Sequence, residues 1–166
     1  MPDKRTIEKA RQDARQGKSP STQAGEFVRA EIDKIRRGEH GARSTKQAIA
    51  IGLSEARRAG VKLKPAKKGQ AKRRTRKSAE YAYEAGQGKR KTRRRPRVAR
   101  AVKRALKREP TGTVSRAALS RQAKRAARRK ASSRSAASRK ALRTKGAAAR
   151  ATAARKAART RARRRK

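Results

Sequence analysis

Apolar residues recur at helical spacing close to the N-terminus of the chain. Ile7, Ala10 and Ala14 lie three and four residues apart, the spacing of one helix face. Thr6 can cap the first turn, and a glycine followed by Ser-Pro-Ser ends the pattern. This stretch predicts a short helix over residues 6–16.

A second stripe of apolar residues begins after that turn. Phe27 and Ile35 are among the apolar residues that fall close to one face, and basic residues collect at the end of the stretch. Ser21 or Thr22 can cap the helix, and Gly38 suits the position just after it. We therefore predict a helix that runs to about residue 37, with Phe27 in a small core.

The stretch from Gly38 to Gly60 carries the clearest helix signals in the sequence. Ser44-Thr45-Lys46-Gln47 has the pattern of a capping box, in which the glutamine reaches back to the cap amide. An apolar stripe follows, and Gly60 closes the element. The pattern predicts a third helix that starts at Ser44.

The remainder of the chain has weaker signals. Residues 65–97 mix turn formers with runs of charge, with one or two helical turns possible over residues 78–86. Residues 98–166 repeat Ala, Arg and Lys without a fixed period. The expected fold is mainly α: a head of about three short helices over 1–64, a basic linker over 65–97, and a tail over 98–166. We expect the tail to be largely disordered, with segments that become helical when phosphates neutralise their charge.

Charge divides the chain unevenly. Residues 1–60 hold 14 basic and 8 acidic residues, a net charge of +6. Residues 61–166 hold 42 basic and 3 acidic residues, a net charge of +39. A moderately charged head with an extremely basic tail is typical of proteins that bind nucleic acid.

The tail indicates binding to phosphate. Its 39 net charges match roughly 39 phosphates, or about 20 base pairs of duplex DNA. Solubility alone needs far less charge, and a membrane-surface helix needs bulky apolar residues on one face. With aromatic residues at 2% of the sequence, base stacking and sequence readout are poorly supported. We expect contacts that are largely independent of sequence.

The second and third predicted helices allow several interpretations. They could form a helical hairpin that simply folds, or a helix-turn-helix whose third helix reads the major groove. They could also contact phosphate generally near the N-terminus of the third helix. Gly38-Glu39-His40-Gly41 resembles the GxxG loop of K-homology domains, although the strands of that fold are missing.

Basic residues of the head, the linker and the tail are the candidate nucleic-acid contacts. They are Arg36, Arg37, Arg43, Lys46, Arg57, Arg58, Arg73, Arg74, Arg93, Arg94, Arg95, Arg128, Arg129, Lys130, Arg163, Arg164 and Arg165.

The sequence offers little for catalysis or for metals. It has no cysteine, no carboxylate cluster, no nucleophile beside a base and no phosphate-binding glycine loop. Its single histidine, His40, lies between residues typical of an exposed loop. We expect no enzymatic activity, no cofactor and no metal. No secretory leader or membrane span is visible, so we expect an intracellular protein associated with the nucleoid.

Two resemblances support this view. The segment "IRRGEHGARSTKQAIAIGLSEARRAG" resembles a bacterial family of unknown function that carries an HGARSTKQAIAIGLSxARRAG block ahead of basic tails. The tail from about Arg97 is similar in composition to those of linker histones and bacterial histone-H1-like proteins. That similarity implies DNA binding and compaction without enzymatic activity. The uneven charge and the small core of the head indicate separately that residues 21–60 are available for a protein partner or self-association. The alternatives are an RNA- or ribosome-associated protein and a protamine-like packaging protein.

Overall fold

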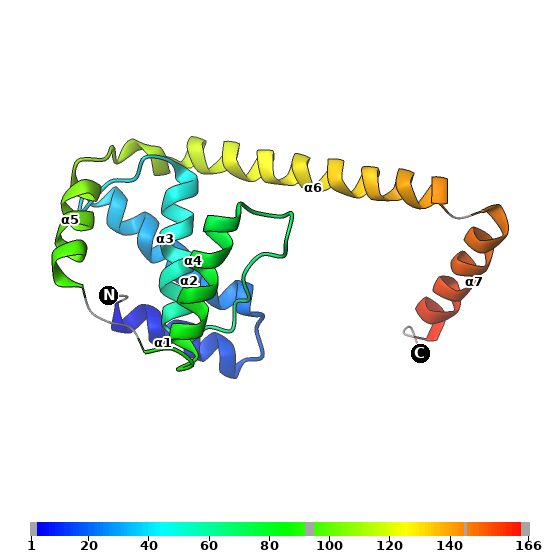
Figure 1. Cartoon of the computed structure of the whole chain (residues 1–166), viewed down its shortest axis with the longest axis horizontal. Helices are drawn as coiled ribbons and strands as arrows, with labels where there is room; N and C mark the ends of the chain where they lie inside the picture. The colour runs from blue at the N-terminus through cyan, green and yellow to red at the C-terminus, as the bar shows by residue number, and fades with distance from the viewer. Residues whose placement is uncertain (1–2, 92–94, 145, 164–166) are drawn as a thin grey trace. The chain divides into compact units, whose positions relative to one another are not determined.

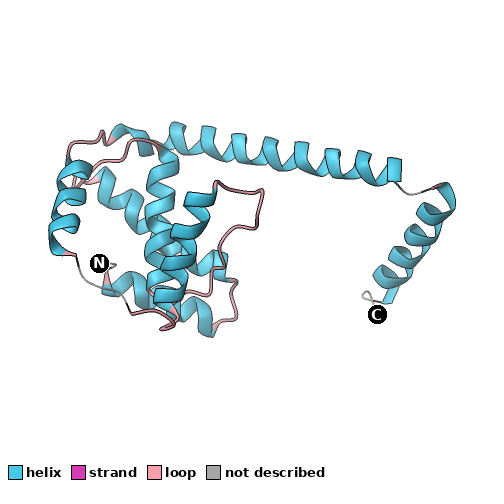
Figure 2. Ribbon diagram, viewed as in Figure 1, coloured by secondary structure: helices cyan, strands magenta, loops and turns pink. Residues whose placement is uncertain are grey.

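A computed structural model describes residues 3–91, 95–144 and 146–163 of the chain. These residues form seven α-helices and one short 3-10 helix, and no strand occurs among them (Figures 1 and 2). The contacts divide the chain into two compact units, Met1–Ser120 and Arg121–Lys166. The mainly helical fold predicted from the sequence is therefore confirmed.

The first two helices begin slightly earlier than the sequence pattern suggests. Helix α1 spans Lys4–Arg15, and the Asp3 side chain accepts a hydrogen bond from the backbone in its first turn, so Thr6 is not the cap. Helix α2 spans Pro20–Arg36 and is capped by Ser19. Its first residue is a proline, which needs no hydrogen-bond acceptor there and is therefore favoured at a helix start.

Helix α3 spans Thr45–Arg58, and Ser44 caps it as predicted. The Ser44 hydroxyl accepts a hydrogen bond from the amide of Gln47. The Gln47 side chain in turn accepts one from the amide of Arg43, one residue before the predicted partner. Both ends of the capping interaction are thus made, with the return contact displaced by one residue.

The core of the first unit consists of two small clusters. In the first cluster, Phe27 of α2 is fully buried, as predicted, and packs with small residues from α1 and α3. Gly52 of α3 lets helices α2 and α3 approach closely, because a Cβ atom there would lie 2.7 Å from the Cα of Val28. Among the described residues, six of the ten buried hydrophobic side chains are alanines, so the helices are held by close backbone approach more than by bulky apolar groups.

A fourth helix, α4, spans Arg73–Gly86 and packs on α3. It lies within residues 65–97, where the sequence predicts a linker with at most one or two helical turns. Ala82 is fully buried, and the side chain of Gln87 donates a hydrogen bond to the carbonyl of Gly60. Helix α3 is thus covered by α2 and by α4 (Figure 1).

The chain returns to the head after helix α5, which spans Pro96–Lys107. We call residues 108–114 the strap; they include the short 3-10 helix η1, Gly112–Val114. Val114 is fully buried and completes the second core cluster with Ile35 and two alanines. The strap therefore belongs to the same compact unit as α1–α4.

The prediction of a largely disordered tail is wrong, because the C-terminal part of the chain is mostly helical. Helix α6 spans Arg116–Thr144 and helix α7 spans Ala147–Arg163. Alanine and arginine are among the best helix formers, and no glycine or proline interrupts either helix. Gly146 lies between them. Propensity thus decides the local structure here, and the repulsion among cations does not prevent it.

Candidate nucleic-acid interface

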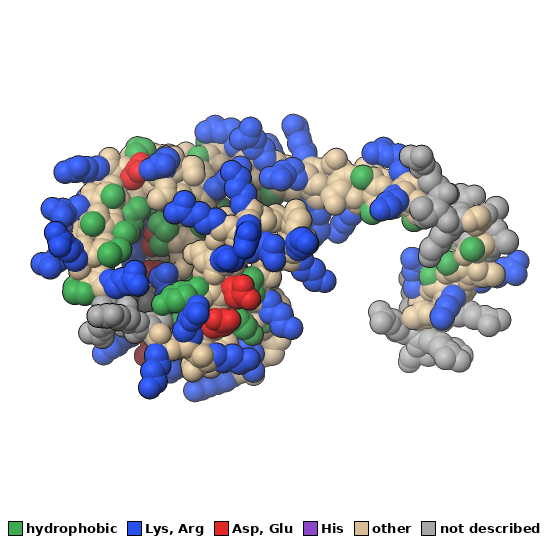
Figure 3. Space-filling model, in the orientation of Figure 1, with side chains coloured by type: hydrophobic (Ala, Val, Ile, Leu, Met, Phe, Trp, Pro, Cys, Tyr) green, Lys and Arg blue, Asp and Glu red, His purple; other side chains and the backbone are tan. Residues whose placement is uncertain are grey.

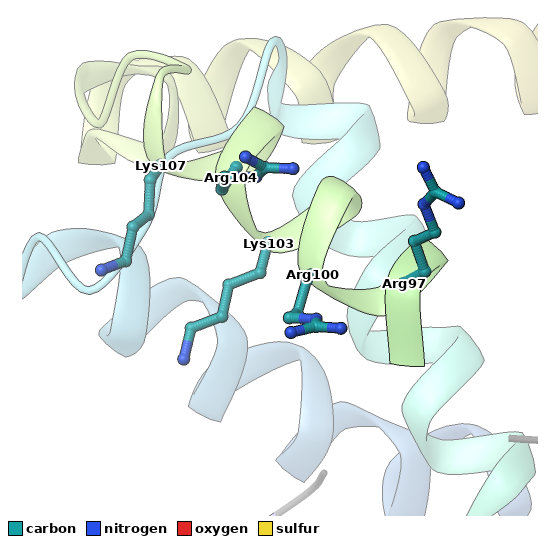
Figure 4. Close-up of a pocket in the computed structure, with 5 residues that line it drawn as sticks. All are labelled: Arg97, Arg100, Lys103, Arg104 and Lys107. Atoms are coloured by element: carbon teal, nitrogen blue, oxygen red, sulfur yellow. The ribbon is translucent and has the colours of Figure 1, made fainter. Parts of the chain in front are cut away.

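Helix α5 presents a continuous basic face that is the most concentrated candidate site. Each of its five cations has another three or four residues away, which places them on one side of the helix. They line a pocket of about 490 Å³, shown in Figure 4. They are Arg97, Arg100, Lys103, Arg104 and Lys107.

The opposite face of α5 is apolar and also exposed. Val98 is 54% exposed and Val102 is 52% exposed, and α5 contributes no buried residue. The helix is therefore held mainly through its end, where the carbonyl of Leu106 accepts a hydrogen bond from Gly41. Hydrophobic side chains are visible at the position of α5 in Figure 3.

The basic face of α5 was missed among the candidate residues, although a signal for it exists in the sequence. The cations between Arg97 and Lys107 alternate with a valine and alanine stripe at helical spacing. The neighbouring candidates Arg93, Arg94 and Arg95 belong to an uninterrupted run of arginines, which is the more conspicuous signal in the sequence. Because spacing decides which charges share a helix face, this interrupted pattern places five cations on one side of α5.

Helix α6 forms an extended basic rod. Its 29 residues correspond to a length of about 43 Å. It contains no acidic residue, and its side chains from residue 123 to residue 141 are exposed. The predicted contacts Arg128, Arg129 and Lys130 lie within this exposed stretch. Figure 3 shows lysine and arginine side chains along the helix.

Two predicted contacts in the head serve the fold. The guanidinium of Arg36 donates two hydrogen bonds to the carbonyl of Val114. The guanidinium of Arg57 donates to the carbonyls of Leu63 and Leu53, and burial lowers the pKa of Arg57. Both side chains therefore donate to backbone carbonyls with N–H groups that would otherwise be available to phosphate.

Other predicted cations of the head lie next to acids. Arg37 and Glu39 form an ion pair at 2.7 Å, and Arg43 lies 3.4 Å from Glu109 of the strap. These pairs lower the charge available to phosphate on that side of the head. Lys46 is exposed in the first turn of α3.

The structure brings some predicted residues of α3 and α4 together. Arg57 and Arg74 line one pocket of about 460 Å³ between these helices, together with Arg76. Arg58 and Arg73 are exposed nearby in sequence. This pocket combines arginines with serine and threonine side chains, but one of its arginines already binds backbone carbonyls.

Some of the predicted contacts lie outside the described residues or at the ends of helices. Arg93, Arg94, Arg164 and Arg165 lie outside the described residues. Arg163 is the last residue of α7, and Arg95 is exposed immediately before α5.

His40 is not the exposed loop residue that the sequence suggests. Its side chain is 18% exposed, and its Nε2 atom lies 3.5 Å from Oε1 of the buried Glu31. Burial raises the pKa of Glu31, whose Oε1 has no hydrogen-bond partner. Within the described ranges, no cluster of three or more His, Cys, Asp or Glu residues could hold a metal ion.

The contacts of α2 and α3 bear on the interpretations of this hairpin. The face of α3 that would read bases as a helix-turn-helix includes Ser54 and Arg57, and these residues line the pocket shared with α4. The Gly38–Gly41 loop donates its Gly41 amide to Leu106, where a GxxG loop would contact a nucleic-acid backbone. This arrangement favours the helical hairpin, whose loop contacts the end of α5 in the same chain.

Residues 3–68 match a protein family of unknown function (DUF6496). The comparison with curated proteins and the comparison with solved structures each found no match. Among the described residues, no helix is both long and apolar enough to span a membrane.

Proposed function

We propose that the protein binds duplex DNA through its phosphates, largely without regard to sequence, and compacts it without enzymatic activity. The observation that carries this proposal is the pair of acid-free basic surfaces on α5 and α6. Each presents cations on an exposed helix, and neither helix contains an Asp or Glu residue that could neutralise them. Phosphate is the abundant cellular anion that occurs in long regular arrays.

The composition of the chain supports contact with phosphates in preference to bases. Aromatic residues for stacking are scarce, and the α3 face that could enter a groove is partly occupied by α4. Cations on several separate elements can reach more than one duplex, which is the physical requirement for compaction. This is the function that a histone-H1-like tail would serve.

Binding measured as a function of salt tests the proposal. Arg97, Arg100 and Arg104 are exposed, so replacing all three with Gln should leave the fold intact. If each neutralises one phosphate, the slope of log K against log salt becomes shallower by about 2.7. Replacing the same three with Lys keeps the charge and should keep the slope.

Two results would overturn the proposal. One is a full chain without measurable affinity for duplex DNA at about 50 mM salt, where phosphate contacts are strongest. The other is a Gln triple variant with an unchanged slope, which would remove α5 from the interface and with it the pair of basic surfaces on which the proposal rests. Tighter binding to structured RNA than to DNA at equal salt would instead favour the RNA-associated alternative.

A further inference from the structure

The strap binds a defined site on the head, which we call the strap site. It comprises the end of α2, the loop after it and the first turn of α3. The amides of Gly41 and Ala42 donate hydrogen bonds to the carbonyls of Leu106 and Pro110, at 2.8 and 3.1 Å. The Leu106 carbonyl lies at the end of α5 and the Pro110 carbonyl lies in the strap, so both contacts are made to backbone, which is how proteins commonly bind extended peptides.

Two threonines add a reciprocal pair of hydrogen bonds. The hydroxyl of Thr45 donates to the carbonyl of Thr113 at 2.6 Å, and the hydroxyl of Thr113 donates to the carbonyl of Ala42 at 2.9 Å. Val114 then inserts its side chain beside Ile35 and is fully buried. One apolar anchor with surrounding hydrogen bonds is the arrangement of a peptide-recognition site.

Gly41 shows that the site is shaped around the strap. A Cβ atom at this position would lie 1.8 Å from the carbonyl oxygen of Glu109. Gly41 is not among the glycines with positive φ, so the loop itself does not require glycine there. The close approach of the strap backbone is therefore what excludes a side chain.

The strap site and the strap are separable parts of the chain. All residues of the site lie within residues 3–68, the range of the family match, and the strap lies outside it. Helix α5, which leads into the strap, contributes no buried residue, and the hydrogen bond that it accepts from Gly41 is at Leu106, next to the strap. The strap can therefore leave one head and bind another with the same contacts.

Local concentration decides when this exchange occurs. Residues 87–107 connect α4 to the strap and act as a tether, which gives the chain's own strap an effective concentration on the order of mM. At ~10 µM free chain, about 1% of sites would therefore hold a strap from another copy. On saturated duplex DNA, one chain per ~20 base pairs spaces copies by about 70 Å, which corresponds to about 5 mM. Nucleic acid thus brings a second copy into the range where it competes.

We propose that the strap site, when the chain is crowded on nucleic acid, binds the strap of a second copy of this chain and so links neighbouring copies. The proposal rests on the proposed function for the source of crowding. It gives residues 21–60 a partner, namely residues 108–114 of another chain.

Cross-linking between two differently tagged full-length chains tests this proposal. The sequence has no cysteine, so a single cysteine can be placed in each chain, Arg43→Cys in one and Glu109→Cys in the other. These side chains lie beside each other when the strap is bound. A short bismaleimide reagent then joins the two chains only where a strap occupies the site of another copy.

We expect heterodimer to increase at least about tenfold when duplex DNA is added at one chain per ~20 base pairs. Gly41→Ala in the chain that carries Arg43→Cys should remove the increase, because it blocks the site. Gly25→Ala is the matched control, since a Cβ atom at Gly25 meets nothing within 4 Å. DNA binding is measured in the same samples.

The outcomes separate the two proposals. If the chains bind DNA but heterodimer stays at the Gly41→Ala level, exchange is refuted while the proposed function stands. If the chains do not bind DNA, the proposed function fails, and the same cross-linking at about 5 mM free chain decides exchange. A chain that carries both cysteines reports binding of its own strap and shows that the site is intact.

Discussion

Replacing Val114 with alanine should weaken the strap without disturbing the rest of the head. Val114 is fully buried in a cluster that also contains Ile35, Ala42 and Ala48. The change removes two carbon atoms' worth of buried apolar surface, at about 0.8 kcal/mol each, and leaves a small cavity. The expected loss in strap binding is about 2 kcal/mol, or roughly 30-fold in the equilibrium between bound and released strap.

Amide hydrogen exchange reads this equilibrium directly. The amides of Gly41 and Ala42 are protected by carbonyls at the end of α5 and in the strap, so their protection should fall by about 30-fold in Val114→Ala. Amides inside α2 should be unchanged. Val98→Ala is the matched control, because that valine is 54% exposed and should cost little. Unchanged protection at Gly41 and Ala42, or an equal loss throughout α2, would refute the reasoning.

Two further predictions concern stability of the head. Burial raises the pKa of Glu31 in the folded state above its ordinary value of 4.5, so this group's contribution to the free energy of unfolding falls as the pH rises through the folded pKa. In urea unfolding, the free energy of unfolding of the wild type should therefore fall relative to that of Glu31→Gln between pH 4 and pH 8. A difference between the two proteins that stays constant with pH would contradict the effect. The variant His40→Gln tests whether the neighbouring imidazole moderates it. Gly52→Ala should destabilise the head by more than about 1 kcal/mol because its Cβ meets the Val28 backbone, whereas Gly25→Ala, in an open helical position, should stabilise it by about 0.5–1 kcal/mol. Equal urea midpoints for the two glycine variants would refute the close-approach argument.

The first three helices could be predicted because their signals are local. The Ser44 cap, the apolar stripe with Phe27 and the closing glycines each act within a few residues, and the structure contains all three helices. The exact caps of α1 and α2 were less predictable, because Asp3 and Ser19 compete with other good cap residues close by. The helical state of α6 and α7 could have been favoured from alanine content alone.

The strap could not be predicted from the sequence. Its residues, "REPTGTV", show no periodicity, and only Val114 is apolar enough to suggest burial. The contacts that hold it join residues 66 to 78 positions apart and involve mainly backbone carbonyls, which every sequence supplies. Because the residues around the strap are mostly charged, the sequence gives no sign that the strap is packed against the head. The same holds for α4, whose one fully buried residue is an alanine.

The insertion of Val114 into the second core cluster has a consequence for how this protein is divided. Sequence similarity to the family ends at residue 68, but the polypeptide that fills the head's interior continues to residue 114. A fragment cut at the similarity boundary would lack Val114 and so expose the cluster around Ile35 to water. The stretch that matches the family and the stretch that packs together are thus different lengths of chain.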